Sequence, residues 1–517
     1  MSLTAAAKKR LIALHGWSAT VLALLLYVVM LTGTIIVFDN EIRLWSEGLS
    51  DMQSPLRHDT GPLVERFAAQ TPPALHETVR IGRGTGDNVM LQFSGRATDR
   101  EGHAHTFLRA YEVNPRNNLL IATHAGELGE VDLRPPSRAL EEFLVDLHVR
   151  LHVPGRWGLY LSGLAGIAML VAAITGVMIH RHILKEMFVT ERPGKRLVSF
   201  RDRHNLAGVW SLPFAVLLAF TGAFLSFATS LGLPVVAMSA FGGDQEQAIN
   251  AVLGERPAFT AEPAPIADID TVFALAATRM NSFPGGAEIR HYGTANAEVR
   301  TFHSAPQGAL RSITLRFDGT TGTFLGRAQL VGTAPSAGNT MAELISPLHF
   351  GTFAGLWSRF LWAAMGAAMT YTIVSGLQLW LRRRADSWRG GAHALITTVW
   401  GLPIALCGAA YGYFLTRLTG DPAMGTNIGF LCTALGCIAA SAIWPAFTIK
   451  HLQRVLGIAL LGLPLIRLQT GGLSWGEALV FDAHMLLFIE TLCLIGGALF
   501  VLSSRRNQAD ATPVVAE

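Results

Sequence analysis

Cysteine and charge are both scarce in this chain of 517 residues. Its four cysteines all fall in the last quarter of the sequence, at Cys407, Cys432, Cys437 and Cys493. A disulfide framework is therefore excluded for the long polar segments nearer the N-terminus. Charged residues make up 15% of the chain, well below the share in ordinary soluble proteins. No glycine-rich nucleotide motif or phosphate loop is present, so the sequence predicts no nucleotide-binding domain.

The chain is instead rich in long apolar runs. Half of its residues are hydrophobic, and eight runs approach the ~20 residues that cross a bilayer. They predict a polytopic α-helical membrane protein with spans over 11–38, 157–179, 206–227, 356–381, 395–415, 428–447, 455–468 and 479–502. The seventh run is short enough to be either a tilted span or a re-entrant segment.

The first four spans form two equivalent halves, each consisting of a span, a polar α+β lobe and a second span. The first half is predicted as a span over 1–38, a lobe over 39–147 and a span over 148–182. After a loop over 183–203, the second half repeats this order over 204–228, 229–348 and 349–384. A four-span extension follows over 385–506, and a tail over 507–517 ends the chain.

Histidines recur at matching span ends in the two halves. His15 corresponds to His204, and His148 corresponds to His349. Small residue pairs repeat with them, namely Thr32-Gly33, Thr221-Gly222, Thr175-Gly176 and Ser375-Gly376. Equivalent histidines can meet near a pseudo-twofold axis, where a four-helix bundle can hold a flat macrocycle between two axial imidazoles. The repeat predicts two b-type haems, held non-covalently because no Cys-x-x-Cys-His motif exists. His15 and His204 would ligate one iron, and His148 and His349 the other.

Two further histidines are candidates for the same sites. His152 lies one helical turn after His148, so either can be the ligand and the other a hydrogen-bond or propionate partner. His180 ends the second span, where it can contact or ligate the inner haem. Taken singly, a histidine at a span end can also lie simply in the lipid headgroup region. In the extension, His484 near Asp482 and Glu490 forms a polar cluster suited either to proton or quinone chemistry or to packing alone.

Basic residues gather in the loops on one side of the predicted spans. They are Lys8, Lys9, Arg10, Lys185, Arg192, Lys195, Arg196, Arg201, Arg203, Arg382, Arg383, Arg384, Lys450, Arg454, Arg505 and Arg506. The positive-inside rule makes that side the cytoplasm, with the N-terminus there and both lobes in the periplasm of a bacterial inner membrane. The first span is expected to be retained, because it is too long for a cleaved signal peptide. The net charge of +4 comes mainly from these loops, so lipid is the expected partner and nucleic acid is not.

Several motifs resemble those of the PepSY-associated transmembrane family over roughly residues 8–385. They are Leu14-His15-Gly16, Leu147-His148, Arg203-His204, Leu348-His349-x-Gly351 and Gly376-Leu377-x-Leu379-Trp380. The resemblance implies PepSY lobes outside the cytoplasm and a di-haem reductase of ferric siderophores that releases Fe(II) for bacterial iron uptake. Because every predicted cytoplasmic loop is short, electrons would come from a membrane quinol or a separate redox protein.

Two other classes of function remain compatible with the sequence. A haem-free scaffold or sensor would bind a periplasmic partner through its lobes, and a transporter would also show duplicated halves. The predicted distance between the two haems is large for a single electron transfer step. The 17 residues from His15 to Thr32 correspond to ~26 Å of helix. Tryptophans could relay electrons between the two levels, although most of Trp17, Trp157, Trp210, Trp357 and Trp362 are expected to be interfacial or packing residues.

Overall fold

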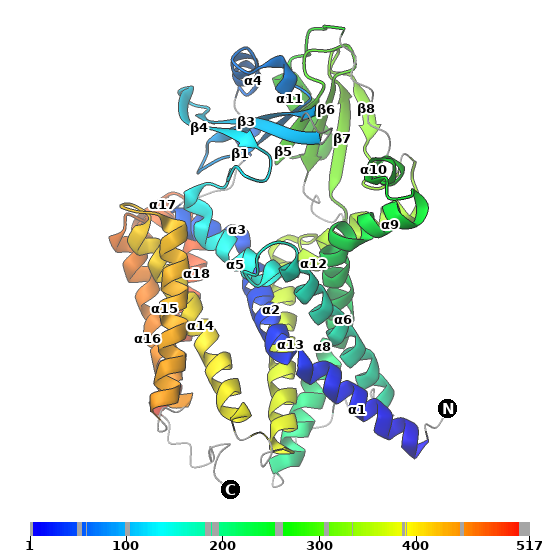
Figure 1. The fold of residues 1–517 in the computed structure, drawn as a ribbon. Coiled ribbons are helices and arrows are strands. Elements are labelled where there is room, and N and C mark those ends of the chain that lie inside the picture. The colour runs from blue at the N-terminus through cyan, green and yellow to red at the C-terminus, as the bar shows by residue number, and fades with distance from the viewer. Residues whose placement is uncertain are drawn as a thin grey trace.

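The computed structural model describes residues 4–48, 54–57, 59–98, 104–180, 188, 196–253, 262–303, 310–332, 334–384, 388, 390–444 and 449–505. Figure 1 shows a bundle of long helices with a single β-sheet lobe standing on one end, called here the lobe end. Seven helices are long and apolar enough to cross a membrane, and a bent pair at the N-terminus supplies an eighth candidate. The structure thus confirms a polytopic helical membrane protein with additional lobes. The seven are α6 (Trp157–Ile179), α8 (Arg196–Phe227), α13 (Gly355–Arg382), α14 (Gly391–Thr416), α15 (Pro422–Ile443), α16 (Ile449–Gln469) and α18 (His484–Arg505).

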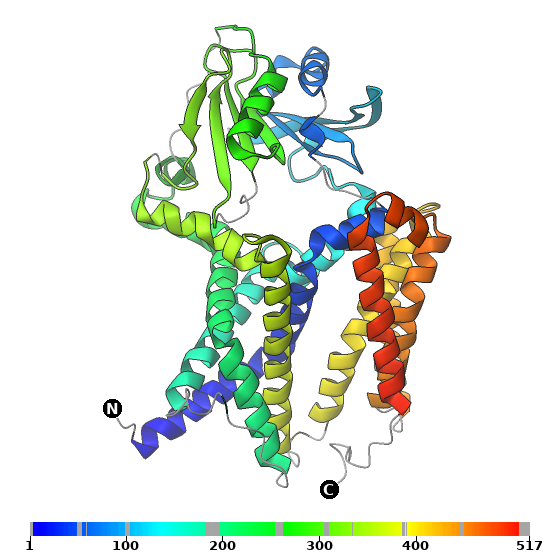
Figure 2. The ribbon, with the colours of Figure 1, turned by 180° about the vertical axis from the view of Figure 1, so that it is seen from behind.

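The first predicted span differs from a straight helix. It consists of α1 (Ala5–Val21) and α2 (Ala23–Ile36), which meet at an angle of 62°. In Figures 1 and 2, α1 leaves the line of α2 and crosses the foot of the bundle. The apolar run predicted a membrane-embedded segment correctly but carried no signal for the bend.

The seventh predicted span is longer in the structure than its apolar run, and the eighth starts later than predicted. The run over 455–468 lies in α16, whose 21 residues are enough to cross a bilayer, so no re-entrant turn is required. The last span was predicted to start at residue 479, but this position lies in the short helix α17 (Trp475–Val480) and α18 starts at His484. Ser474 and Glu477 form a capping box that starts α17, and Asp482 at φ 55° separates the two helices.

The core bundle is built from one pair of spans from each half. Helix α6 packs on α8, α8 packs on α13, and α13 packs on α2. At the lobe end, each half adds a helix that precedes its second span: α5 (Ala139–Arg150) before α6 and α12 (Ala337–Phe350) before α13. His148 and His349 lie near the C-terminal ends of α5 and α12, so they precede the spans α6 and α13 and are not part of them.

The two predicted lobes share one sheet of eight antiparallel strands in the order β4-β3-β2-β1-β5-β6-β7-β8. The strands are β1 (Thr78–Arg83), β2 (Val89–Thr98), β3 (Ala104–Asn114), β4 (Leu119–Glu127), β5 (Gly286–Arg290), β6 (Glu298–His303), β7 (Ile313–Asp318) and β8 (Phe324–Arg327). The halves join where β1 pairs with β5, with Val79 opposite Ile289. The order reads the same from either edge, as expected when a pseudo-twofold axis relates the two halves.

One face of the sheet carries the core of the lobe. Helices α4 (Gly61–Ala68) and α11 (Ile269–Met280) pack their buried phenylalanines, Phe67 and Phe273, against alternate strand residues. The two helices are also joined by Asp270, whose carboxylate accepts hydrogen bonds from the backbone N–H groups of Thr60 and Gly61 at 2.8 and 3.0 Å. The lobe is thus a single packed unit contributed by both halves.

The four-span extension packs beside the core bundle (Figure 1). Helix α3 (Asp39–Glu47) lies at the junction, where the Trp45 indole donates to Glu490 of α18 and Tyr413 of α14 donates to the Ser46 carbonyl. Nearer the middle of the spans, Tyr27 donates to the Val399 carbonyl at 2.6 Å. The remaining described α-helices, α9 (Leu233–Ala240) and α10 (Gln245–Leu253), lead from α8 into the lobe.

Candidate functional site

The four repeated histidines form two facing pairs at opposite ends of the core bundle. His15 of α1 and His204 of α8 have their ring centroids 6.5 Å apart, at the end away from the lobe. His148 of α5 and His349 of α12 have their centroids 6.3 Å apart, at the lobe end. Each pair takes one imidazole from each half of the duplication. The structure therefore brings together the same partners that the sequence repeat predicts.

The pair away from the lobe is oriented by acceptors on the neighbouring spans. Nδ1 of His15 lies 2.9 Å from the Ala172 carbonyl and 3.2 Å from Oγ1 of Thr175. Nδ1 of His204 is held in the same way, 3.0 Å from the Thr372 carbonyl and 3.1 Å from Oγ of Ser375. A carbonyl can only accept, so Nδ1 carries the hydrogen and the lone pair of the neutral ring lies on Nε2.

The pair at the lobe end repeats this arrangement with one difference. Nδ1 of His148 lies 2.8 Å from the Val29 carbonyl, and the Thr32 hydroxyl is at 3.5 Å. Nδ1 of His349 lies 2.8 Å from Oγ1 of Thr221, a hydroxyl that itself donates to the Leu217 carbonyl. The threonine can then only accept from His349, so both rings at this end also leave Nε2 free to bind a metal.

The repeated Thr/Ser-Gly pairs are explained by these contacts. In each pair the hydroxyl residue approaches a histidine Nδ1, and the glycine that follows makes room for the ring. A Cβ on Gly33 would lie 2.7 Å from Cε1 of His148, and one on Gly376 would lie 3.0 Å from Cε1 of His204. The corresponding distances are 3.3 Å for Gly222 and 3.5 Å for Gly176. A histidine, a hydroxyl and a glycine thus make one unit that occurs four times.

A cavity of about 720 Å³ contains the pair away from the lobe. Its walls are largely apolar, with Met169, Leu212 and Ile373 among the lining residues. Basic side chains line it as well, namely Lys8, Lys9, Arg201, Arg383 and Arg384, and His180 joins them. Such a cavity suits a large apolar ring that carries acidic groups at one edge.

The spacing of the imidazoles provides a direct test of the fit to haem. Two metal–nitrogen bonds of ~2 Å and two ring radii of ~1.2 Å place the centroids of trans axial imidazoles ~6.4 Å apart. The observed separations of 6.5 and 6.3 Å agree with this value. The spacing of both pairs therefore fits two imidazoles on one metal, and the pair away from the lobe also lines a cavity that suits a large apolar ring.

The alternative ligands lie differently. His152 has a left-handed backbone, φ 52°, and its ring stacks on Phe143 at 4.4 Å, whereas His148 is the residue that faces His349. His180 is the C-cap of α6 and lines the cavity without belonging to either pair.

The polar cluster predicted around His484 is divided in the structure. His484 and Asp482 form an exposed pair at 3.6 Å, whereas Glu490 is fully buried and pairs with Arg467. The indole of Trp475 also donates to Glu490, at 2.5 Å. Sequence analysis missed this ion pair, although a single arginine within the apolar run of α16 was the available signal.

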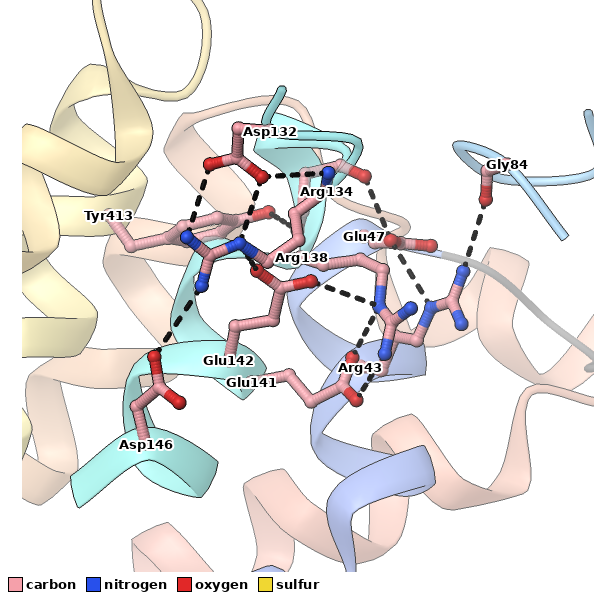
Figure 3. A network of polar contacts seen from close by, with 11 residues as sticks. Arg43, Glu47, Gly84, Asp132, Arg134, Arg138, Glu141, Glu142, Asp146 and Tyr413 are labelled. Atoms are coloured by element: carbon pink, nitrogen blue, oxygen red, sulfur yellow. Dashed lines mark hydrogen bonds and ion pairs between the residues drawn. The ribbon is translucent and has the colours of Figure 1, made fainter. Parts of the chain in front are cut away.

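A network of ion pairs fixes helix α5, which carries His148 (Figure 3). Arg134 bonds Asp132 at 2.9 Å and reaches Glu142 and Asp146 of α5 at 3.4 Å. Arg138 bonds Glu141 at 2.7 Å. Burial raises the pKa of Glu142 to about 7, against the opposing effect of the two arginines. The helix is thus held at the lobe end by charged side chains.

The tryptophans separate into two groups. Trp17, Trp157, Trp210 and Trp357 are more than half exposed on the bundle surface, where lipid or headgroups would surround them. Trp362 of α13 is only 6% exposed, and its indole donates to the Leu348 carbonyl at 2.9 Å, beside His349. Among the proposed relay residues, Trp362 is therefore the one buried within the bundle.

The fold and the site define a duplicated membrane protein in which two span–lobe–span halves share one sheet and two imidazole pairs. The chain belongs to the family described as the PepSY-associated TM region, whose model matches residues 12–383. It is also similar to an uncharacterised protein of Pseudomonas aeruginosa, PA4219, with 31% identity over 263 residues. That match covers 48% of this chain and 64% of the relative. The four-span extension after Arg384 lies outside the family match.

Proposed function

We propose that this protein is a b-type haem oxidoreductase that carries electrons across the bacterial inner membrane to a ferric siderophore or a similar Fe(III) chelate. The observation that carries the proposal is the two facing imidazole pairs, in which every Nδ1 is hydrogen-bonded and every Nε2 would be available to hold a haem iron. Haem bound at these sites would supply a one-electron Fe(III)/Fe(II) couple at each end of the bundle.

The protein's own residues position and tune these sites. Hydrogen bonds from Nδ1 fix the orientation of each ring and raise the basicity of Nε2. The glycines beside the rings leave room for the imidazoles. At the end away from the lobe, Lys8, Lys9, Arg201, Arg383 and Arg384 would pair with the acidic edge of a bound macrocycle.

The distribution of basic residues supports an orientation. The described lysines and arginines around the His15/His204 cavity lie at the end opposite the lobe. By the positive-inside rule this end faces the cytoplasm and the lobe faces the periplasm. Electrons would then enter at His15 and His204, from a quinol or a redox protein, and leave at His148 and His349.

A reduced-minus-oxidised absorbance spectrum with pyridine haemochrome quantification tests the proposal. The purified wild-type protein should contain about two b haems per chain. His349→Ala should lose one haem, and the matched control His152→Ala, one turn beyond the ligand His148, should keep both. Protein reduced in proteoliposomes should be reoxidised by an added ferric siderophore.

Two results would contradict the proposal. A protein expressed with ample haem that contains none would favour a haem-free scaffold or a transporter. Unchanged haem content in His349→Ala would show that His349 is not a ligand. A buried imidazole that serves only for packing can be replaced without loss of the cofactor, whereas a ligand cannot.

A further inference from the structure

The face of the sheet turned away from α4 and α11 carries a row of residues in register across all eight strands. From β4 to β8 the row is His124, Ala110, Gln92, Arg80, Glu288, Arg300, Arg316 and Gly326. Its centre is the β1–β5 junction, where Arg80 lies opposite Glu288. The charged members of the row occupy four adjacent strands, which are ~4.8 Å apart.

Two glutamates, Glu288 and Glu298, hold four arginines of this face. Glu288 accepts from Nε of Arg80 at 3.2 Å and from Nε of Arg290 at 2.7 Å. Glu298 accepts from Nε of Arg300 at 2.5 Å and from Arg316 at the same distance. Both carboxylates are nearly buried, whereas the Arg80 side chain is 55% exposed and that of Arg316 is 37% exposed. The hydrogen bonds that Arg80, Arg290 and Arg300 make to these glutamates use Nε and not their terminal amino groups.

The charges of this cluster do not balance. Four guanidinium groups surround two carboxylates, and Arg300 lies directly opposite Arg316 across the β6–β7 pair. Burial and the neighbouring Arg290 lower the pKa of Arg300. Asp318, the next acidic residue on the face, uses Oδ1 to accept bonds from its own turn. Arg300 and Arg316 share the single carboxylate of Glu298, so the cluster keeps an excess of positive charge that an anion would neutralise.

The duplication shows that the fold itself does not require these charges. The pseudo-twofold axis relates Gln92 to Arg300 and Ala110 to Arg316, because these residues lie at equal distances from the sheet centre in the same row. One half thus has a neutral amide and a methyl group where the other has two arginines. Beyond Arg316 the row ends at Gly326, where an added Cβ would meet only open space. This leaves room beside the guanidinium groups.

We propose that Arg80, Arg290, Arg300 and Arg316 form a binding site for a polycarboxylate anion. Planar guanidinium groups that present two N–H donors match carboxylates in bidentate fashion. This inference rests on the proposed function. Within that function, it identifies the substrate as a negatively charged iron chelate that carries carboxylates. Arg80 comes from the first half and the other three arginines come from the second. The site therefore exists only because the two halves share one sheet.

The site is separate from the imidazole pair at the lobe end. Arg311, just before β7, reaches Glu343 of α12 at 3.6 Å, and this contact connects the strand to the helix that carries His349. Arg316 lies five residues further along β7, which is ~17 Å, and His349 lies six residues along α12, which is ~9 Å. The arginine site would therefore capture the chelate before reduction and take no part in electron transfer.

Titration with gallium(III) citrate, a redox-inert analogue of a ferric polycarboxylate, tests the site on the full-length protein in detergent. Isothermal calorimetry should show saturable binding that weakens with added salt. The double variant Arg300→Gln/Arg316→Gln should bind at least 10-fold more weakly. The matched control Arg116→Gln, which removes an exposed arginine paired with Asp87 outside the row, should bind as the wild type does.

Arg80→Gln is the second variant and should also weaken binding. The Arg80 side chain is exposed, and Glu288 keeps Arg290 as a partner when Arg80 is replaced. This variant decides the outcome if the double variant fails to fold. Wild-type affinity in these variants, or no saturable binding by the wild-type protein, would overturn the proposal. Gallium is not reduced and the assay does not depend on haem, so failure here would leave the haem spectrum and the proposed oxidoreductase unaffected. In steady-state reduction of ferric citrate, the variants should raise KM and leave kcat unchanged.

Discussion

Substitution of Gly33 by alanine is the sharpest test of how the histidines are packed. The new Cβ would lie 2.7 Å from Cε1 and 3.1 Å from Nδ1 of His148. An ordinary carbon contact needs ~3.5 Å or more, so the ring would have to move by ~0.8 Å. The hydrogen bond between Nδ1 and the Val29 carbonyl opposes that movement. Because a ligand site tolerates displacements of only ~0.5 Å, Gly33→Ala should weaken or abolish haem binding at the lobe end.

The duplication provides the matched control for this prediction. Gly176 is the corresponding small residue beside His15, where an added Cβ would lie at 3.5 Å, an ordinary van der Waals distance. Gly176→Ala should therefore retain both haems, whereas Gly33→Ala should retain about one. Both variants place one methyl group in a span, so a general effect on insertion or helix packing would affect both.

Haem content by pyridine haemochrome and a redox titration of the purified variants measure the outcome. Loss of one haem and of one redox transition in Gly33→Ala, with both kept in Gly176→Ala, is the expected result. Equal haem content in the two variants would refute the packing argument. A separate thermal unfolding measurement would show whether Gly33→Ala is folded, independently of its cofactor.

Three other predictions follow from single contacts. Thr221→Val removes the acceptor at 2.8 Å from a histidine Nδ1, so it should raise the midpoint potential of the lobe-end haem, and more than Thr32→Val, whose hydroxyl lies at 3.5 Å. Glu142 holds its proton more tightly in the folded protein, with a pKa of about 7, so its contribution to stability is greatest below pH ~4.5 and is lost as the pH rises through about 7. Glu142→Gln should remove this dependence and stabilise the protein by ~1–2 kcal/mol at pH 8, as measured by thermal unfolding across pH. Glu490→Gln leaves the buried guanidinium of Arg467 without its ion partner, so unfolding should show a loss of ~3–5 kcal/mol, and a loss below ~1 kcal/mol would contradict the buried ion pair.

The sequence predicted what repeats within the chain and failed where the two halves meet. The matching of His15 with His204 and of His148 with His349 was visible because duplication leaves equal spacings. The joining of the two lobes into one sheet was not visible in the sequence. It depends on the pairing of β1 with β5, in which Val79 lies opposite Ile289 more than 200 residues away, and each lobe would show the same strand pattern if it formed a separate sheet. Residues 479–480 were assigned to the last span because they are as apolar as a span, but α17 ends at Val480 and the left-handed backbone of Asp482 separates it from α18.

The hydrogen-bond partners of the histidines were only partly predictable. The Thr/Ser-Gly pairs were recognised as repeats, but their role depends on a histidine from a different span. The carbonyls of Val29, Ala172 and Thr372 could not have been identified at all, because a backbone acceptor leaves no mark in the sequence. The position of each histidine along its helix and the packing of the neighbouring helices decide which carbonyl its Nδ1 contacts.

The arrangement of α13 bears on the distance between the two proposed haem sites. On α8, His204 and Thr221 are 17 residues apart, so the two imidazole pairs are separated by ~26 Å of helix. On α13, however, Trp362 bonds the carbonyl next to His349, and Met369 lines the cavity of His15 and His204. These two buried side chains are seven residues apart, or ~10 Å along the helix. A polarisable aromatic and a thioether thus occupy the interior between the sites, whereas the more exposed tryptophans face outward. If electrons pass between the pairs, Trp362 and Met369 of α13 are buried side chains that would shorten the gap, whereas the exposed tryptophans lie on the bundle surface.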